Sequence, residues 1–428
     1  MSGVKIDPNH SLAAAYARTR GKSVQELSLE ERDYLAQVDA DWAVEDAPVL
    51  SAPAAAASLV EIWDFAVVVK GEQPAVRLRS AIEGAAGRDL LEIVQLDRPF
   101  LVDSVMGEIT ESGFRVRAMC HPVVEIDGVA RSLIQVHLDP VGEDRVEFLL
   151  EQVRETLFDV RRAVGDFKSM RELMHRAIGE LSATHGVTSE EGRQEELAFL
   201  RWLEDDNFVF LGARVYEYPR SPDGGYAAEE PLYEAEAGLG VLKDSTRAVL
   251  RRTHEPAILS AQLRRQLETG TPVVVAKSNL RSRVHRRGFM DYVGVRRYGA
   301  DGKPSGEVRF VGLFTAEAYE TPASEVPLIR HRVARIMRRA AKAPGSHNEK
   351  RLRNILETWP RDELFQTSED NLLSMALGVL HLIDRPRVRL FTRMDPFDRF
   401  ASVLVYIPRE RFDTEVCERA GAILADAY

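Results

Sequence analysis

The chain has very little cysteine: among its 428 residues, only Cys120 and Cys417 carry a thiol. Two cysteines so far apart in sequence exclude a disulfide framework and are typical of proteins in a reducing cytosol. No apolar run of about 18 residues occurs, so we expect no membrane span. The opening residues also lack the apolar core of a secretory signal. We therefore expect a cytoplasmic protein without a membrane partner.

The short motifs that mark common catalytic and cofactor sites are missing as well. A dinucleotide-binding turn needs G-x-G-x-x-G, and Gly238-Leu239-Gly240 lacks the third glycine. No P-loop, zinc-protease, C-x-x-C or G-x-S-x-G motif occurs. The ten histidines show no metal-ligand spacing, and the adjacent acids Glu195-Glu196 are interpreted as a solvated face. We predict no catalytic residue, no metal site and no cofactor site in this chain.

Basic residues are outnumbered by acidic ones, 57 against 67, which gives a net charge of −10. An acidic chain is a poor general binder of nucleic acid, because the phosphates repel it. We therefore expect no nucleic-acid partner. With 45% hydrophobic residues the chain can bury sizeable cores, and its length predicts about two to four domains.

Residues 89–128 carry the clearest fold signal. The apolar run 90–96 predicts a buried strand, and apolar residues recur at helical spacing over 101–109. Gly113 follows where the cap of that helix needs a positive φ. Apolar and polar residues alternate over 114–120, as in a half-buried strand. Asp127-Gly128 is a strong signal for a type I′ hairpin turn.

This order of elements opens a βαββαβ module of the amino-acid-sensing, ACT-like (ferredoxin-like) kind. We expect its second helix at Glu143–Arg154 and its last strand at Thr156–Ala163. A further helix is expected to begin after Ser28, whose hydroxyl would cap it. Ser51–Ser58 fits a linker and a capped helix start about equally well.

The fold class expected for the whole chain is α+β and multidomain, because helical and strand periodicities alternate along it. The predicted parts are a helical N-terminal segment and linker at 1–60, an ACT-like domain at 85–165, a helical connector at 166–204, a β-rich domain at 205–320, a second helical connector at 325–382 and the truncated start of a second ACT-like domain at 387–428.

The loop that leads into the helix at 101–109 is a candidate effector site. A helix N-terminus presents unpaired N–H groups and a partial positive charge, which suit a carboxylate. Asp97 would hold an amino group and Arg98 a second carboxylate, while Val102, Asp103 and Ser104 supply the helix start. The alternative is that Asp97 and Ser104 only cap the helix and Arg98 is solvated.

A basic run between residues 277 and 297 is the strongest charge feature. Arginine side chains match phosphate and carboxylate bidentately, so one interpretation is an anion site. A second is a subunit or interdomain contact against an acidic surface, and a third is a solvated face. The candidate residues are Lys277, Arg281, Arg283, Arg286 and Arg287.

Several blocks become specific when they are taken together. They are residues 89–128, VVVAKSNLRSRVHRRGFMDYVGVRRY, GEVRFVGLFTAEAY, NILETWPRDELFQ and RVRLFTRMDPFDRFASVLVYIPRERFDTEV. In content and order they resemble the N-terminal regulatory region of the large bacterial NAD-dependent glutamate dehydrogenases. The resemblance covers most of residues 85–428.

The resemblance implies that the β-rich domain is PAS-like. It also implies a parent enzyme that converts L-glutamate to 2-oxoglutarate and ammonia with NAD, whose nucleotide-binding domain and catalytic lysine lie further along a longer chain. The partners implied are the rest of that chain, other copies in a homo-oligomer and a small amino-acid effector. The alternatives are a free-standing amino-acid-binding or scaffold protein and, third, an enzyme with an unrecognised site in the β-rich domain.

Overall fold

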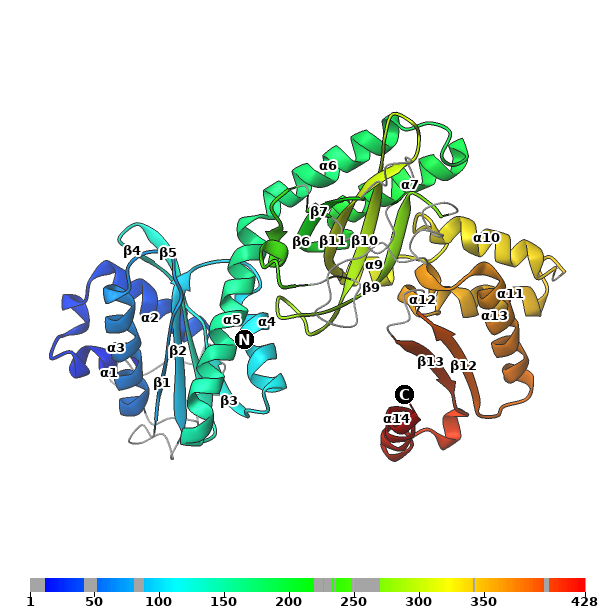
Figure 1. Ribbon diagram of the computed structural model, residues 1–428. Coiled ribbons are helices and arrows are strands. Elements are labelled where there is room, and N and C mark those ends of the chain that lie inside the picture. Colours follow the sequence, from blue (N-terminus) through cyan, green and yellow to red (C-terminus); the bar gives the residue numbers. More distant parts are fainter. Residues whose placement is uncertain are drawn as a thin grey trace. The chain divides into compact units, whose positions relative to one another are not determined.

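The computed structural model describes residues 12–41, 52–80, 88–218, 226, 233–234, 236–247, 249, 270–341, 343–395 and 400–427 (Figure 1). By their contacts the residues form two units. The first comprises Met1–Gly165 and the loop Ser282–Gly288, and the second comprises Asp166–Arg281 and Phe289–Tyr428. Across the described residues, no helix is both long and apolar enough to cross a membrane.

A group of helices opens the first unit: α1 (Leu12–Thr19), η1 (Val24–Glu26), α2 (Leu29–Asp41) and α3 (Ala52–Val68). The rings of Tyr16, Tyr34 and Trp63 pack together in their shared core. At the start of α2, the Glu31 N–H donates to Ser28 Oγ at 3.0 Å and the Ser28 N–H donates to the Glu31 carboxylate at 2.9 Å. The expected serine cap is therefore confirmed as a reciprocal capping box.

Of the two interpretations of Ser51–Ser58, the helix is confirmed over its described residues, and the linker is wrong there, because α3 begins at Ala52. Alanine has the highest helix propensity, and Pro53 lies in the first turn, where proline is tolerated. Ala56 and Leu59 begin the buried stripe of this helix. Because these side chains are buried, the segment is part of the folded core and not a linker.

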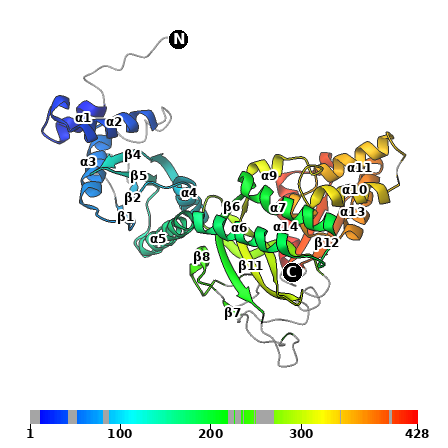
Figure 2. The ribbon, with the colours of Figure 1, turned by 90° about the horizontal axis from the view of Figure 1, so that it is seen from above.

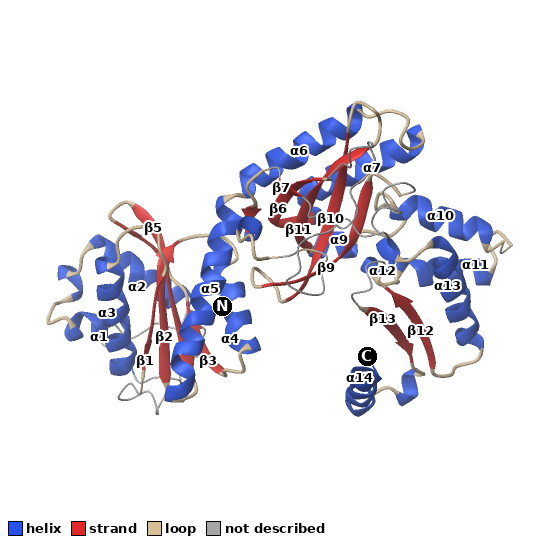
Figure 3. Cartoon of the chain, viewed as in Figure 1, coloured by secondary structure: helices blue, strands red, loops and turns tan. Residues whose placement is uncertain are grey.

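An antiparallel sheet forms the centre of the first unit, with α4 (Leu101–Glu111) and α5 (Glu143–Gly165) beside it (Figure 3). Its strand order is β1-β2-β5-β3, and β4 also pairs with β5. The strands are β1 (Ala75–Arg79), β2 (Asp89–Leu96), β3 (Val116–Cys120), β4 (Val123–Ile126) and β5 (Val129–Leu138).

The strand predicted at Thr156–Ala163 is wrong, because α5 continues through these residues to Gly165. Leu149, Val153, Leu157 and Val160 are all buried, and their spacing of three and four residues is helical. The sheet position beside β2 is taken by β1, which precedes β2 in sequence. The unit thus keeps the strand arrangement of a βαββαβ sheet, with one edge supplied from the N-terminal side.

Both glycine signals of the first unit are confirmed. Asp127 and Gly128 have φ values of 53° and 75°, the two positive values that a type I′ turn requires. Gly113 has φ 79° and ends α4. The Phe114 N–H donates to Ile109 O and the Gly113 N–H to Thr110 O, both at 3.0 Å, which is the Schellman pattern.

The second unit opens with α6 (Phe167–Ala183) and α7 (Glu190–Trp202), which lie along a second antiparallel sheet (Figure 2). The order of that sheet is β7-β6-β11-β10-β9, with β8 paired to β6. Its strands are β6 (Phe208–Glu217), β7 (Tyr233–Glu234), β8 (Leu239–Gly240), β9 (Val273–Ser282), β10 (Gly288–Tyr298) and β11 (Pro304–Phe314), with η3 (Leu203–Asn207) before β6 and η4 (Val241–Lys243) after β8.

Helices follow, as expected, and one apolar core runs from α6 through the sheet to these helices. They are α9 (Ala316–Glu320), α10 (Ile329–Arg339), α11 (His347–Glu357), α12 (Arg361–Gln366) and α13 (Glu369–Asp384). The hairpin of β12 (Arg389–Met394) and β13 (Ala401–Tyr406), η5 (Arg409–Arg411) and α14 (Thr414–Ala427) come last. Leu390 and Ile423 remain exposed there.

A buried carboxylate ties β1 to its sheet. Glu92 on β2 is fully buried and accepts from Arg77 at 2.6 Å, from Arg79 at 3.0 Å and from Gln135 at 3.0 Å. Both arginines lie on β1. The edge strand therefore supplies the positive charge that a carboxylate taken out of water requires.

We predict that the double variant Arg77→Ala/Arg79→Ala destabilises the first unit by about 3–5 kcal/mol, because it leaves Glu92 buried and unpaired. The matched control is Arg117→Ala, which breaks an ion pair with Asp139 whose two partners are both more than one-third exposed. That control should cost less than about 1 kcal/mol. Hydrogen exchange of the β2 amides measures both. Equal losses in the two variants would contradict the assigned role of Glu92.

Candidate functional site

The residues predicted to bind an effector lie at the end of β2 and at the start of α4. Asp97 is exposed and accepts a hydrogen bond from the Ser132 hydroxyl at 2.6 Å, so it is held toward β5. Arg98 and Val102 are half-buried. Asp103 and Ser104 lie in the first turn of α4. The binding of an effector by these residues therefore stays a prediction.

The loop Ser282–Gly288, which belongs to the same unit, contacts this helix start. The His285 N–H donates to Ser104 Oγ at 2.9 Å, and His285 Nδ1 lies 3.2 Å from the Asp103 carboxylate. The His285 ring also packs against Phe100, with 5.1 Å between ring centroids. A ligand at Ser104 would have to compete with the chain's own loop.

The same loop is anchored further along α4 by an ion pair. Arg287 Nη2 donates to Glu108 at 2.7 Å, and the Thr156 hydroxyl donates to the same carboxylate oxygen at 2.7 Å. Glu108 is buried. Arg283 adds a hydrogen bond to Gln152 at 3.0 Å.

The five cations of the basic run do not converge on one place. Lys277 lies 2.6 Å from Asp291 and 3.0 Å from Asp362. Arg283 and Arg287 contact α5 and α4, as described above. Arg281 stacks over the Phe289 ring, 5.7 Å from its centroid, while Arg286 is exposed. The contacts described for these residues are separate from one another, and the three interpretations of the basic run stay predictions.

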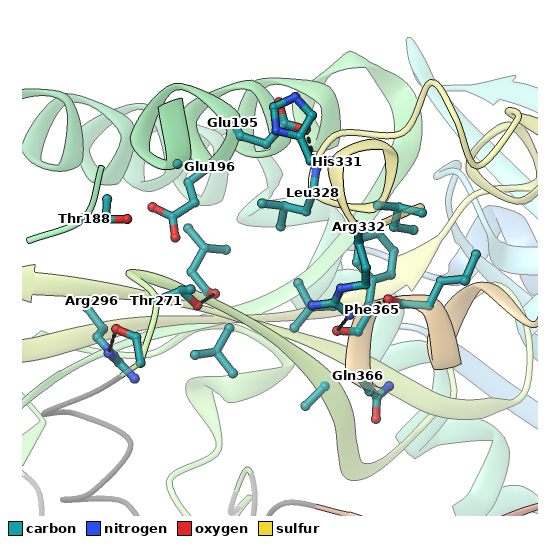
Figure 4. Close-up of a pocket in the computed structure, with 18 of the residues that line it drawn as sticks. Thr188, Glu195, Glu196, Thr271, Arg296, Leu328, His331, Arg332, Phe365 and Gln366 are labelled. Carbon is teal, nitrogen blue, oxygen red and sulfur yellow. Dashed lines mark hydrogen bonds and ion pairs between the residues drawn. The ribbon is translucent and has the colours of Figure 1, made fainter. Parts of the chain in front are cut away.

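A pocket of about 380 Å³ in the second unit was not predicted from the sequence (Figure 4). Its walls come from α7, β9, α10 and α12, with Arg296 from β10. Apolar side chains, including Val273, Ile329 and Leu364, form much of the lining. Charged groups from different helices face it, which is the composition of a small-molecule site.

On the α7 side the pocket holds Glu196, which is only 3% exposed. A backbone hydrogen bond from Val273 reaches its carboxylate, but one oxygen, Oε2, has no hydrogen-bond partner among the described residues. Burial raises the pKa of Glu196 to about 7, while the Val273 hydrogen bond and the charge of Arg296 act in the opposite direction. Its neighbour Glu195 differs: Arg330 donates to it at 2.7 Å and the Leu328 N–H at 2.8 Å.

On the α10 side the pocket holds Arg332. Its Nη1 donates to the carbonyls of Leu364, Phe365 and Thr367, the last two at 3.0 Å. These carbonyls end α12 and would otherwise lack partners. The Nε atom is buried and has no hydrogen-bond partner among the described residues. Burial lowers the pKa of Arg332.

The interpretation of Glu195-Glu196 as a solvated face is wrong, since both side chains are buried. One signal in the sequence could have shown this. Glu196 lies three and four residues before Phe199 and Leu200, which are both fully buried, so it continues the apolar stripe of α7. Among the described residues, no group of three or more acidic, histidine or cysteine side chains is placed to hold a metal ion.

Comparison with known families matches three parts of this chain. The ACT1 domain model of glutamate dehydrogenase matches residues 34–157, the helical motif 1 model matches 326–385, and the ACT2 domain model matches 389–428. With the mixed helices and sheets, this defines a chain of the α+β class that contains ACT domains.

Curated relatives narrow the class. The NAD-specific glutamate dehydrogenase of Halomonas elongata is 33% identical over 86% of this chain and 24% of its own length. The enzyme of Pseudomonas aeruginosa is 30% identical over 99% of this chain and 27% of its own length. The enzyme of Mycobacterium tuberculosis is 33% identical over 65% of this chain and 16% of its own length. The chain belongs to the large NAD-specific glutamate dehydrogenase family and matches its N-terminal region, as the resemblance predicted. It spans about a quarter of the length of the first two relatives.

Among solved structures, an RNA-binding light-oxygen-voltage receptor aligns with 69% of this chain and 89% of its own, at 11% identity and a TM-score of 0.14. A similarity that low carries no argument about fold or function.

We predict a coupling of about 1–3 kcal/mol between Arg287 and Glu108 in a double-mutant cycle of Arg287→Ala and Glu108→Gln. The physical reason is that Arg287 supplies the cationic partner of a buried carboxylate. Arg286→Ala, on the exposed side of the loop, is the control. Hydrogen exchange in α4 reports the free energies, and a coupling near zero would mean that the loop is not anchored there.

We predict that Glu196→Gln changes how stability depends on pH. The folded-state pKa of Glu196 is about 7, against 4.5 for the free side chain. The wild-type free energy of unfolding should therefore fall as the pH rises between these values, by on the order of 3 kcal/mol in total. The variant should lack this fall, whereas Glu191→Gln, on the exposed side of α7, should retain it. Denaturant unfolding at about pH 5 and pH 8 measures the difference.

Proposed function

We propose that this chain is the N-terminal regulatory part of an NAD-dependent glutamate dehydrogenase. The complete enzyme would convert L-glutamate and NAD to 2-oxoglutarate, ammonia and NADH. One observation carries the proposal: curated NAD-specific glutamate dehydrogenases match 86% and 99% of this chain, but the match spans only 24% and 27% of their own length. On this proposal NAD is the cofactor of the complete enzyme and is bound outside these residues.

The division into domains belongs to the same proposal. It comprises the helical segment at 1–60, the first ACT-like domain at 85–165, connectors at 166–204 and 325–382, a PAS-like domain at 205–320 and a second ACT-like domain beginning at 387. The antiparallel five-strand path β7-β6-β11-β10-β9, with helices beside it, supports a PAS-like label. A cytoplasmic location is supported by the low cysteine content.

The partners we propose are the rest of the dehydrogenase chain and further copies in a homo-oligomer. ACT-like modules have open sheet edges and helix faces through which such contacts form, and exposed Leu390 and Ile423 lie on the module that begins at β12. A small amino-acid effector at Asp97–Ser104 remains a prediction, and it would have to displace the His285 N–H from Ser104.

The alternative function is a free-standing amino-acid-binding or scaffold protein. The reading frame of the gene distinguishes the two. If it continues beyond Tyr428 into a nucleotide-binding domain, the dehydrogenase is supported. A stop codon directly after Tyr428, with no dehydrogenase gene beside it, would favour the free-standing protein.

We predict that the 428-residue chain alone forms no NADH from glutamate and NAD, because it carries no dinucleotide-binding motif. Absorbance at the NADH band measures turnover, and calorimetry with NAD measures binding. The control is the complete enzyme under the same conditions. Turnover that persists after repurification of the chain would overturn the regulatory assignment.

A further inference from the structure

Two polar atoms in the pocket of the second unit lack the partners that burial demands. Glu196 Oε2 and Arg332 Nε are both buried and have no hydrogen-bond partner among the described residues. Buried polar groups are almost always hydrogen-bonded in folded proteins, so each exception needs a physical explanation. Both atoms belong to side chains that line the same pocket.

The structural role of Arg332 accounts for only part of its guanidinium. Its Nη1 satisfies three carbonyls at the end of α12, which explains why an arginine occupies this position. The role leaves Nε unexplained. Among the described residues, no carboxylate lies within ion-pair distance of Arg332, and the charge of Glu369 acts on it only from further away. A half-buried cation of this kind suits an anion that arrives from outside.

The other charged residues of the lining are already paired. Glu195 holds Arg330 at 2.7 Å, Arg335 is paired with Glu369, and Arg296 donates to Gly270 O at 2.8 Å. Among the lining residues, Glu196 and Arg332 are those with a buried side-chain atom that has no hydrogen-bond partner in the described part of the chain. They come from α7 and α10, and apolar side chains lie between them (Figure 4).

We propose that this pocket binds a small organic molecule with a carboxylate at one end, held by Arg332, and an amine at the other, held by Glu196. The apolar lining from Val273, Ile329 and Leu364 would contact the middle of the molecule. The volume of about 380 Å³ lies within the range of small-molecule sites. Burial disfavours the ionised carboxylate of Glu196. An ammonium group beside it would favour that ionised form, so the bound ligand would stabilise the negative charge.

The probe is a series of ω-amino acids that differ only in length: glycine, 4-aminobutyrate and 6-aminohexanoate. Hexanoate and hexylamine each carry one of the two end groups. Titration of the 428-residue chain by calorimetry and thermal shift should show binding by the member that spans the two side chains. The compounds with a single end group should bind at least about tenfold more weakly, since each charge-assisted hydrogen bond contributes to affinity.

Two variants test the assignment. Arg332→Gln and Glu196→Gln should each weaken binding of the best probe by about ten- to a hundredfold. Arg339→Gln, further along the same helix and paired with Asp370 at the surface, should leave binding unchanged. Because Arg332 also supports α12, we include Arg332→Lys, which keeps the positive charge at this position. Separately, hydrogen exchange of the wild-type chain shows whether the probe protects α7 and β9.

If no member of the series binds at millimolar concentration, the proposal is wrong and water completes the hydrogen bonds of the pocket. Undiminished binding in both Arg332→Gln and Glu196→Gln, or protection that appears outside α7, β9, α10 and α12, would also overturn it. Binding is a property of this chain alone, whereas any control of catalysis by the ligand rests on the proposed function. Absence of binding would therefore leave the dehydrogenase assignment untouched.

Discussion

In the second unit, one half-buried ammonium group is held between two carboxylates and ties a helix to the sheet. Lys277 on β9 lies 2.6 Å from Asp291 on β10 and 3.0 Å from Asp362 on α12. The two acids raise the pKa of Lys277 above its ordinary value, against the effect of burial. Loss of Lys277 would leave the buried Asp291 carboxylate without its cation, which costs several kcal/mol. This triad therefore fixes α12 against β9, and these two elements form walls of the pocket.

The features that the sequence predicted correctly are those that neighbouring residues decide. The capping box at Ser28, the αL glycine at Gly113 and the type I′ turn at Asp127-Gly128 each need only a few adjacent residues. The errors concern choices between distant segments. Residues 156–163 have enough apolar character for a strand, but the sheet edge beside β2 is filled by β1, so the helix α5 continues. A local sequence pattern does not show which of two distant segments pairs with the edge of a sheet.

Buried charge was the other feature that the sequence could not show. An acidic residue looks the same in sequence whether water or an arginine far along the chain surrounds it. Glu108 is neutralised by Arg287, which lies 179 positions away, and Glu195 by Arg330, which lies 135 positions away. The candidate effector residues Asp103 and Ser104 could be located on a helix start, but their contact with His285 could not be anticipated. The composition gives the number of charged residues, but the ion pairs between them depend on the three-dimensional structure.

The adjacent residues Glu195 and Glu196 differ in role: Glu195 is structural, and Glu196 is the residue that we propose binds a ligand. Both are buried on one helix, so both bear a similar cost of leaving water. Glu195 recovers that cost through Arg330 and the Leu328 N–H, and it fixes α10 against α7. Glu196 lines the pocket and accepts a backbone hydrogen bond from Val273, and its Oε2 atom has no hydrogen-bond partner among the described residues. The Val273 hydrogen bond offsets only part of the cost of burying Glu196 among the described residues, and the proposed ligand would offset the rest. In a chain with no catalytic motif, that points to recognition.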